Sequence, residues 1–372
     1  MFEILTLNKI SKYGLEKLDP AKYVYGDAAA APDAIMVRSA AMHDMTLDQK
    51  TVAVARCGAG TNNIPVDACA ANGVVVFNTP GANANGVKEL VLCAMLLASR
   101  KIVPGIEWCK TLKGQGDAVG KAVEKGKSAF VGPEIKGKTL GVVGLGAIGR
   151  LVADAAVKLG MTVIGYDPFP VKGVNEDVQV VTTLDPIFAE SDYITLHAPA
   201  TPETKGMINK AAIGAMKDNV RILNFARGDL VNADDLLSAL ADGKVAAYAT
   251  DFPTDAMLDA EGVIAMPHLG ASTPESEDNC AVMAAEELTA YLETGAIRNS
   301  VNFPNAPLSA DFAVRTCVLH TEAAAEAVAA ALGDVTFAGA KKGYGYTVAD
   351  KAADEAALAA IDGVVRVRML KK

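Results

Sequence analysis

The chain has 372 residues and a formal net charge of −9, and 51% of its residues are hydrophobic while only 5% are aromatic. This length allows two or three domains with large cores, and the acidic charge without a Lys/Arg cluster argues against nucleic acid or a membrane as a partner. No apolar run is long enough to span a membrane, no leader segment is visible, and the six cysteines form neither a CxxC pair nor a Cys/His spacing, so we expect a cytoplasmic protein with reduced thiols and no metal.

Short strands and helices alternate from the first residue to Pro80, as in an open α/β domain. We expect strands at 2–7, 23–25, 34–37, 52–55 and 74–77, and helices at 11–18, 47–50 and 66–72. Arg38 and Arg56 each follow one of these strands. Because such sheets bind ligands beyond the carboxyl ends of their strands, the loops that carry these arginines are candidates for contact with a small anion.

The next segment leads into a second domain. Apolar residues recur at helical spacing over 86–99, which predicts a long helix. The stretch at 108–132 is rich in Gly and Lys and irregular, so we expect it to be a crossover between domains. The second domain then begins near Lys136.

A glycine-rich turn opens this second domain. The motif Gly144-x-Gly146-x-x-Gly149 lies between an apolar strand and a helix, and the next strand ends at Asp167. This order is typical of a dinucleotide-binding unit, in which the glycines allow a tight turn, the approach of a pyrophosphate and close helix packing. The alternative is a plain Gly-rich turn. Asp167 lies where an adenosine ribose is bound, and no Arg or Lys follows it to pair with a 2′-phosphate, so NAD is predicted rather than NADP.

Later strands of the second domain also end in polar loops. We expect these strands at 178–181, 193–196, 221–225, 247–249 and 263–266. The loops after them contain His197, Arg227, Asp251 and His268, and all fall at the edge of the sheet that carries the glycine turn. A guanidinium can hold a carboxylate through two hydrogen bonds, and an imidazole can remove a proton from an alcohol. Arg227 and His268 are therefore candidates for these two tasks.

The last part of the chain reads as a smaller module. A helix at 276–294 and the stretch from Ser300 to Pro304 complete the main body of the protein. Strands are then expected at 312–319, 335–338, 344–348 and 364–369, with helices at 322–332 and 354–361. This βαββαβ order is the ferredoxin-like plan.

Taken together, the motifs resemble those of the D-isomer-specific 2-hydroxyacid dehydrogenases. The signatures are Val37-Arg-Ser39, Arg56-Cys-Gly-Ala-Gly-Thr-Asn-Asn-Ile64, Phe77-Asn-Thr-Pro80, Gly137-Lys-Thr-Leu-Gly141, Leu223-Asn-Phe-Ala-Arg-Gly-Asp-Leu-Val231 and Pro267-His-Leu-Gly-Ala-Ser-Thr273. The resemblance implies an α/β protein of two doubly wound parallel-sheet domains, flavodoxin-like and Rossmann, with the active site in the cleft between them. It implies a discontinuous substrate-binding domain at 1–97 and 278–305, an NAD-binding domain at 98–277 and an ACT-like module at 306–372.

The resemblance also implies catalytic roles. Arg227 would hold the substrate carboxylate, and His268 would take the hydroxyl proton as hydride leaves the carbon. The family pairs this histidine with a Glu in Asp-Val-Phe-x-x-Glu-Pro, but this chain reads Thr250-Asp-Phe-Pro-Thr-Asp255 and has no Glu there. Asp255 is our candidate for the partner of His268, with Asp251, Asp259 and Glu261 as alternatives, and its other reading is a helix cap or turn residue.

Binding roles follow from the same resemblance. Cofactor contacts are expected from Gly144, Gly146, Ala147, Ile148, Gly149, Asp167, Ala198, Phe225, Ala226, Asp251 and Gly270. Substrate contacts are expected from Arg38, Ser39, Arg56 and Asn83, although salt bridges that hold loops would also explain the arginines. His197 is interpreted as structural, and His43 and His320 as incidental. The family suggests a homodimer or higher homo-oligomer, and the module either binds serine for feedback control or serves in assembly.

The substrate is expected to be a small anionic 2-hydroxy acid. Arg38, Arg56 and the His268-Leu-Gly-Ala-Ser-Thr273 run favour the phosphoglycerate-oxidising branch of the family, which acts in serine synthesis. One alternative is another D-2-hydroxyacid dehydrogenase, such as a glyoxylate or hydroxypyruvate reductase. A second is an NAD-sensing binding protein similar to the C-terminal-binding corepressors, because the loop after Asp251 departs from the family pattern.

Overall fold

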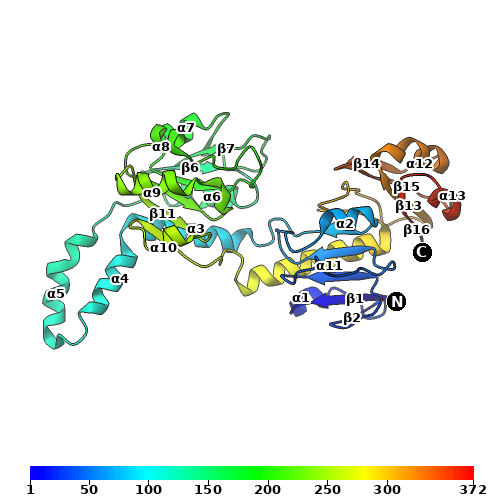
Figure 1. The fold of residues 1–372 in the computed structure, drawn as a ribbon, viewed down its shortest axis with the longest axis horizontal. Coiled ribbons are helices and arrows are strands. Elements are labelled where there is room, and N and C mark those ends of the chain that lie inside the picture. Colours follow the sequence, from blue (N-terminus) through cyan, green and yellow to red (C-terminus); the bar gives the residue numbers. More distant parts are fainter. The chain divides into compact units, whose positions relative to one another are not determined.

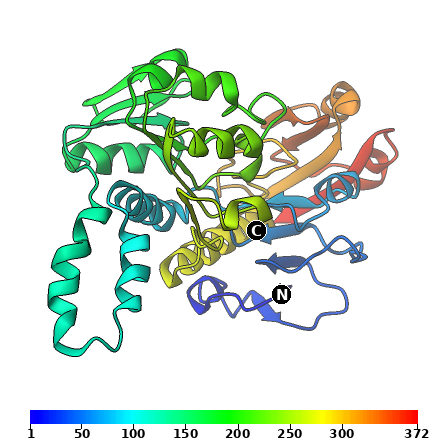
Figure 2. The same cartoon turned by 60° about the vertical axis from the view of Figure 1, so that its left-hand side comes forward.

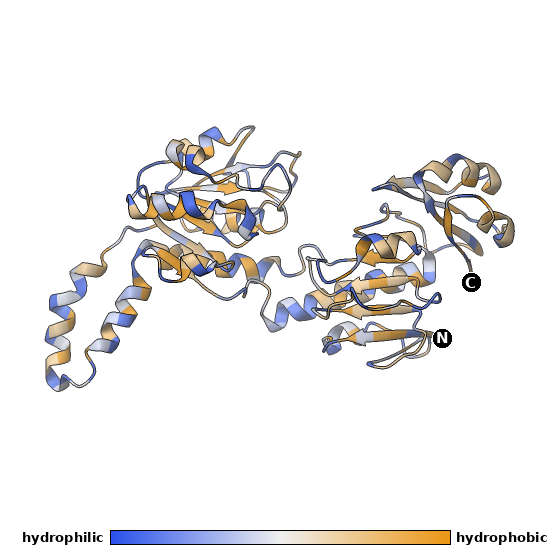
Figure 3. Ribbon diagram, viewed as in Figure 1, coloured by the Kyte–Doolittle hydropathy of each residue, from blue (hydrophilic) through white to orange (hydrophobic).

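The computed structural model describes all residues from Met1 to Lys372, and the chain divides into two compact units. Unit 1 consists of Met1–Asn83 and Pro274–Lys372, and unit 2 of Ala84–Thr273. Figure 1 shows a sheet covered by helices in each unit. The apolar residues gather on the strands and on the helix faces that cover them (Figure 3). No helix is both long enough and apolar enough to cross a membrane.

Unit 1 contains a parallel sheet of five strands in the order β2-β1-β3-β4-β5. The strands are β1 (Phe2–Leu7), β2 (Tyr23–Gly26), β3 (Ala34–Val37), β4 (Ala53–Arg56) and β5 (Val75–Phe77). The helices are α1 (Lys12–Leu15), α2 (Val66–Ala71) and the long α11 (Pro274–Thr294). A Cβ at Gly14 of α1 would lie 2.5 Å from the backbone of Ala281, so glycine lets α1 pack directly on α11. This strand order is that of flavodoxin, as expected.

The short helix predicted at 47–50 is wrong. The structure has a turn there instead, in which the carboxylate of Asp48 accepts the backbone N–H of Lys50 at 2.8 Å and the carbonyl of Asp48 accepts the N–H of Thr51. An Asp side chain that bonds to the backbone two residues ahead favours a turn over a helix.

Unit 2 contains a parallel sheet of seven strands in the order β12-β11-β10-β9-β6-β7-β8. The strands are β6 (Thr139–Val143), β7 (Thr162–Tyr166), β8 (Val178–Val181), β9 (Tyr193–Leu196), β10 (Val220–Asn224), β11 (Val245–Thr250) and β12 (Val263–Ala265). The helices include α3 (Ala84–Ser99), α6 (Gly149–Lys158), α7 (Asp185–Glu190), α8 (Lys210–Ala215), α9 (Ala233–Ala241) and α10 (Asp255–Leu258). The strand order reverses between β6 and β9, which is where a Rossmann sheet binds its ligand.

The stretch from Trp108 to Gly132 was predicted to be irregular, and this is wrong. It belongs to a pair of helices, α4 (Ile102–Thr111) and α5 (Val119–Gly126), which extend away from the sheet of unit 2 (Figure 2). Trp108 packs on Phe130 with ring centroids 5.3 Å apart, and a Cβ at Gly126 would overlap the indole ring. Gly126, one of the glycines that suggested a loop, therefore allows close packing on the tryptophan.

The C-terminal module is a four-stranded antiparallel sheet in the order β14-β15-β13-β16, which is the ferredoxin-like order. Its elements are β13 (Val314–Thr321), α12 (Ala325–Leu332), β14 (Phe337–Lys341), β15 (Tyr344–Ala349), α13 (Glu355–Ala359) and β16 (Val364–Lys371). The module packs on the rest of unit 1. Arg366 donates to the backbone carbonyls of Gln49 and Asn72, and Arg368 donates to those of Tyr291 and Leu292.

Candidate active site

The glycine turn after β6 has the shape of a dinucleotide cradle. Gly144 has a φ of 92°, and a Cβ there would lie 2.8 Å from the backbone carbonyl of His197. A Cβ at Gly149, the first residue of α6, would overlap the carbonyl oxygen of Gly144. A Cβ at Gly146 would meet no atom within 4 Å. Two glycines therefore allow the turn and the helix packing, and the third leaves open the space that a pyrophosphate needs.

Asp167 closes this cradle from the end of β7. One of its carboxylate oxygens accepts the N–H of Leu145 at 2.8 Å, and the other accepts the N–H of Phe169 at 3.0 Å. Ala147 and Ile148 lie between the turn and α6, where helix N–H groups have no partner within the helix. The carboxylate keeps lone pairs for the hydroxyl groups of a ribose. These residues fit the dinucleotide expected from the sequence.

Arg227 follows β10 and is held by a buried asparagine. Asn224, the last residue of β10, donates from Nδ2 to the carbonyl of Arg227 at 2.9 Å and accepts the N–H of Ala226 with its Oδ1 at 3.2 Å. The exposed guanidinium of Arg227 makes one hydrogen bond, to the carbonyl of Ala226 at 2.7 Å. Sequence reasoning missed Asn224. The signal was a polar residue at the end of an otherwise apolar strand.

Asp251 and His268 follow strands β11 and β12 at the same edge of the sheet. The side chain of Asp251 is buried, and its Oδ1 has no hydrogen-bond partner. Burial raises the pKa of Asp251, while the nearby charge of His268, the N–H of Gly270 and the charge of Arg227 oppose this rise. The exposed ring of His268 packs on Phe252, with centroids 4.6 Å apart. The three groups Arg227, Asp251 and His268 therefore form one electrostatic cluster.

Asp255 lies outside this cluster. It is exposed, it begins the short helix α10, and no hydrogen bond or ion pair joins it to His268. Asp259 is the C-cap of the same helix, and Glu261 is also exposed. Asp251, in contrast, is buried, and the charge of His268 counteracts the rise in its pKa that burial causes.

His197 has a different environment from His268. Its Nε2 lies 2.9 Å from the hydroxyl of Thr195, and its buried Nδ1 has no partner. Burial lowers the pKa of His197 to about 3. The ring is therefore neutral across the physiological range, which suits a packing role beside Ala198 rather than proton transfer.

The substrate candidates Arg38, Ser39, Arg56 and Asn83 all belong to unit 1. The guanidinium of Arg38 pairs with Glu277 in the first turn of α11 at 2.5 Å. The N–H of Ser39 donates to Asn8 at 2.9 Å. A Cβ at Gly58 would overlap the guanidinium of Arg56, so this glycine allows the arginine to fold across the turn at 58–60.

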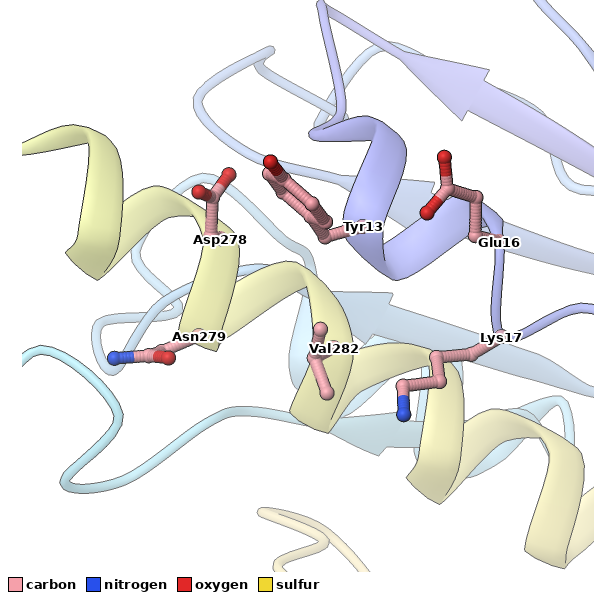
Figure 4. Close-up of a pocket in the computed structure, with 6 residues that line it drawn as sticks. All are labelled: Tyr13, Glu16, Lys17, Asp278, Asn279 and Val282. Atoms are coloured by element: carbon pink, nitrogen blue, oxygen red, sulfur yellow. The ribbon is translucent and has the colours of Figure 1, made fainter.

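A separate shallow hollow lies between α1 and α11 (Figure 4). It is lined by Tyr13, Glu16, Lys17, Asp278, Asn279 and Val282. None of these residues is among the site candidates. Its lysine pairs with Glu286 at 3.9 Å, and both side chains are half exposed, so the hollow is a polar surface feature.

Comparison with known proteins decides the family. Residues 92–270 match the description "D-isomer specific 2-hydroxyacid dehydrogenase, NAD binding domain". The chain is 36% identical to a D-3-phosphoglycerate dehydrogenase of Bacillus subtilis over 323 residues, which is 82% of this chain and 59% of the relative. It is 38% identical to one from Methanocaldococcus jannaschii over 267 residues, 70% of this chain and 49% of the relative. The protein is a member of the D-isomer-specific 2-hydroxyacid dehydrogenase family.

A solved structure supports the same family assignment. An NAD+-bound 3-phosphoglycerate dehydrogenase of Entamoeba histolytica has 27% identity and a TM-score of 0.63, and the match covers 81% of this chain and 98% of that one. The matched residues 92–270 fall within unit 2 and include the glycine turn and Asp167. Unit 2 is thus the NAD-binding domain, and NAD is its cofactor. The chain spans about half the length of the curated relatives it matches.

Proposed function

We propose that this dehydrogenase oxidises D-3-phosphoglycerate to 3-phosphohydroxypyruvate, the first step of serine biosynthesis. The observation that carries the proposal is the cluster of Arg227, Asp251 and His268 beside the glycine turn. Relatives named D-3-phosphoglycerate dehydrogenase, at 36% and 38% identity over most of the chain, support the choice of substrate.

In this proposal His268 removes the proton of the C2 hydroxyl, and Arg227 holds the C1 carboxylate. NAD, when bound, accepts the hydride from C2. We assign the role of histidine partner to Asp251 instead of Asp255. Its buried carboxylate, which is close enough to sense the charge of His268, would stabilise the imidazolium that forms during the reaction.

In unit 1 we propose Arg38, Ser39, Arg56 and Asn83 as the residues that bind the substrate anion. Two guanidinium groups suit a phosphate because each can donate two hydrogen bonds. Arg38 is paired with Glu277, so an incoming phosphate would either share the guanidinium with that carboxylate or displace the carboxylate from it. The pair is 40% exposed on both sides, and an exposed pair of this kind contributes only about 0–1 kcal/mol, which leaves Arg38 available.

The test is NADH formation from NAD and D-3-phosphoglycerate by the full chain. Turnover with this substrate above that with glycerate or lactate is expected. Turnover restricted to the other hydroxy acids, or reduction of glyoxylate or hydroxypyruvate by NADH, would replace the substrate assignment. Binding of NADH without turnover of any hydroxy acid would favour the NAD-sensing alternative.

We also propose that the enzyme is a cytoplasmic homodimer assembled through the α4–α5 helix pair. Neither helix has a buried residue, and Ile102, Val103, Ile106, Val119 and Val131 are exposed on or beside this pair. A second copy would remove these side chains from water. Ile106→Glu is expected to give monomers by light scattering, and Val180→Glu, at an exposed valine of β8, is the control. A dimer that persists in Ile106→Glu with unchanged affinity would contradict this interface.

The proposed cytoplasmic location rests on the six cysteines, which are all unpaired and so suit a reducing compartment.

A further inference from the structure

One buried carboxylate of unit 1 has no part in the chemistry proposed above. Glu287 lies on α11 with its side chain 0% exposed. Its Oε1 accepts a hydrogen bond from Nδ2 of Asn299 at 2.6 Å, and its Oε2 has no hydrogen-bond partner. An acid in such a place costs stability when it ionises, so its presence calls for a reason other than packing.

Asn299 connects this carboxylate to the edge of the sheet. Its backbone has a φ of 56°, a left-handed conformation, at the point where the chain enters a short extended segment. That segment pairs with β5 through a bridge between Ser300 and Phe77 and a bond from the N–H of Val301 to the carbonyl of Val76 at 2.9 Å. The side-chain bond to Glu287 therefore fixes the residue from which the segment starts.

The connection continues into the loops that carry the substrate candidates. The carbonyl of Asn299 accepts the N–H of Asn78 at 3.3 Å, and Nδ2 of Asn78 donates to the carbonyl of Ala59 at 2.6 Å. The next residue, Thr79, donates its N–H to the carbonyl of Gly58 at 3.1 Å. These bonds tie Asn299 to the turn at 58–60, across which Arg56 folds.

Several other charged or titratable groups face Glu287. Glu286 precedes it on α11, Arg298 approaches it from the next segment with Nε 3.9 Å from Oε1, and Cys57 faces it from the end of β4. Burial raises the pKa of Glu287 to about 7, against the hydrogen bond from Asn299 and the charge of Arg298. Burial, with smaller contributions from Cys280 and Glu287, raises the pKa of Cys57 to about 12, so the thiol stays neutral. Glu287 is thus the group of this cluster that changes charge near neutral pH.

We propose that Glu287 is a positioning residue for substrate binding, which holds the turn at 58–60 and Arg56 in place through Asn299 and Asn78. This inference rests on the proposed function, in which Arg56 binds the substrate anion. It predicts that changes at Glu287 act on the KM for the substrate and leave kcat and the affinity for NADH unchanged, since the chemistry and the cofactor belong to unit 2.

The experiment compares three variants of the full chain. Glu287→Leu removes the acceptor for Asn299 and should raise the KM for D-3-phosphoglycerate roughly three- to tenfold, the effect expected for one lost hydrogen bond. Glu287→Gln keeps an acceptor oxygen and should restore KM at about pH 6. Glu326→Gln, at an exposed glutamate of α12 in the same unit, is the control and should behave as the wild type.

The KM measured over a series of pH values is a second readout, which a purely structural role of Glu287 would not change. Ionisation of Glu287 places a negative charge near Cys57, the residue that follows Arg56, so the KM for the anionic substrate should rise in the wild type relative to that of Glu287→Gln between about pH 6 and about pH 8. Using the ratio of the two proteins cancels the titration of the substrate phosphate. Parallel KM profiles, together with an unchanged KM in Glu287→Leu, would overturn the inference.

Hydrogen exchange separates failure of this inference from failure of the proposed function. Amides of the peptide containing residues 57–62 should exchange faster in Glu287→Leu than in the wild type, whether or not the protein oxidises D-3-phosphoglycerate. If the wild type is inactive and this exchange is faster, the link to the turn stands and the substrate assignment falls. Unchanged exchange in this peptide would overturn the link. Should Glu287→Leu not fold, Asn299→Ala breaks the same connection and is judged by the same criteria.

Discussion

Alanine at Gly146 should separate cofactor binding from folding. A Cβ at this position meets no atom of the protein within 4 Å, and the backbone of Gly146 is not in the left-handed region. The substitution therefore adds no clash to the folded state. It should instead stabilise the protein by about 0.4–1 kcal/mol, because alanine restricts the unfolded chain.

The same methyl group would stand where the pyrophosphate of NAD approaches the turn. Forcing a methyl-sized group into a filled contact typically costs about 1–3 kcal/mol, which corresponds to a rise in the Kd for NADH of roughly 5- to 150-fold. Gly149→Ala offers the opposite case. Its Cβ would overlap the carbonyl oxygen of Gly144, so α6 would have to move away from the turn and the free energy of unfolding should fall by about 1–3 kcal/mol.

Two measurements on each variant decide this. Fluorescence titration gives the Kd for NADH, and urea denaturation gives the free energy of unfolding. Gly214→Ala, at a glycine of α8 with open space around it, is the control for a glycine substitution away from the turn. If Gly146→Ala binds NADH as tightly as the wild type, the pyrophosphate does not contact this glycine, and the binding site described above is wrong.

Two further predictions concern carboxylates. Asp251→Asn should lower kcat roughly tenfold or more, because the imidazolium that forms at His268 loses its counter-charge. Asp255→Ala should leave kcat unchanged, and the reverse outcome would return the role to Asp255. Glu287→Gln should stabilise the protein at about pH 8 and much less at about pH 5. The pKa of Glu287 rises from 4.5 to about 7 on folding, so the folded state retains the proton between these values and stability falls as pH increases through them, by about 3 kcal/mol in total. Urea denaturation of both proteins at both pH values checks this. Equal free energies of unfolding for the wild type and Glu287→Gln at pH 8 would show that the ionised carboxylate does not destabilise the folded state.

The sequence was informative wherever local pattern and tertiary structure favour the same element. The apolar strands of unit 2 are buried on both faces, so their continuous apolar runs predicted β6, β7 and β9 well, and the glycine spacing predicted the turn. The α4–α5 pair was missed because the Gly and Lys residues at 108–132 are typical of a loop, although no residue of either helix needs to be buried for the pair to form. Gly126 contributed to the error, because it serves to pack Trp108.

The carboxylate beside His268 could not be chosen from the sequence for a related reason. Counting along the loop favoured Asp255, since it aligns with the family's glutamate after one deletion. Burial favours Asp251 instead: it is 2% exposed directly after β11, whereas Asp255 begins an exposed helix. Alignment fixes the order of residues but not the direction in which a shortened loop turns its side chains.

Contacts within unit 1 connect the C-terminal module to the residues proposed to bind the substrate. Arg368 stacks on Tyr291 and donates to carbonyls near the C-terminal end of α11, and Arg366 donates to the carbonyl of Asn72 at the end of α2. A cation at a helix C-terminus is favoured by the helix dipole, so these contacts hold β16 against both helices. The same α11 carries Glu277, which pairs with Arg38, and Glu287, which holds Asn299. One helix therefore joins the docked module to both arginines proposed for the substrate, and a displacement of the module would be felt first in the KM.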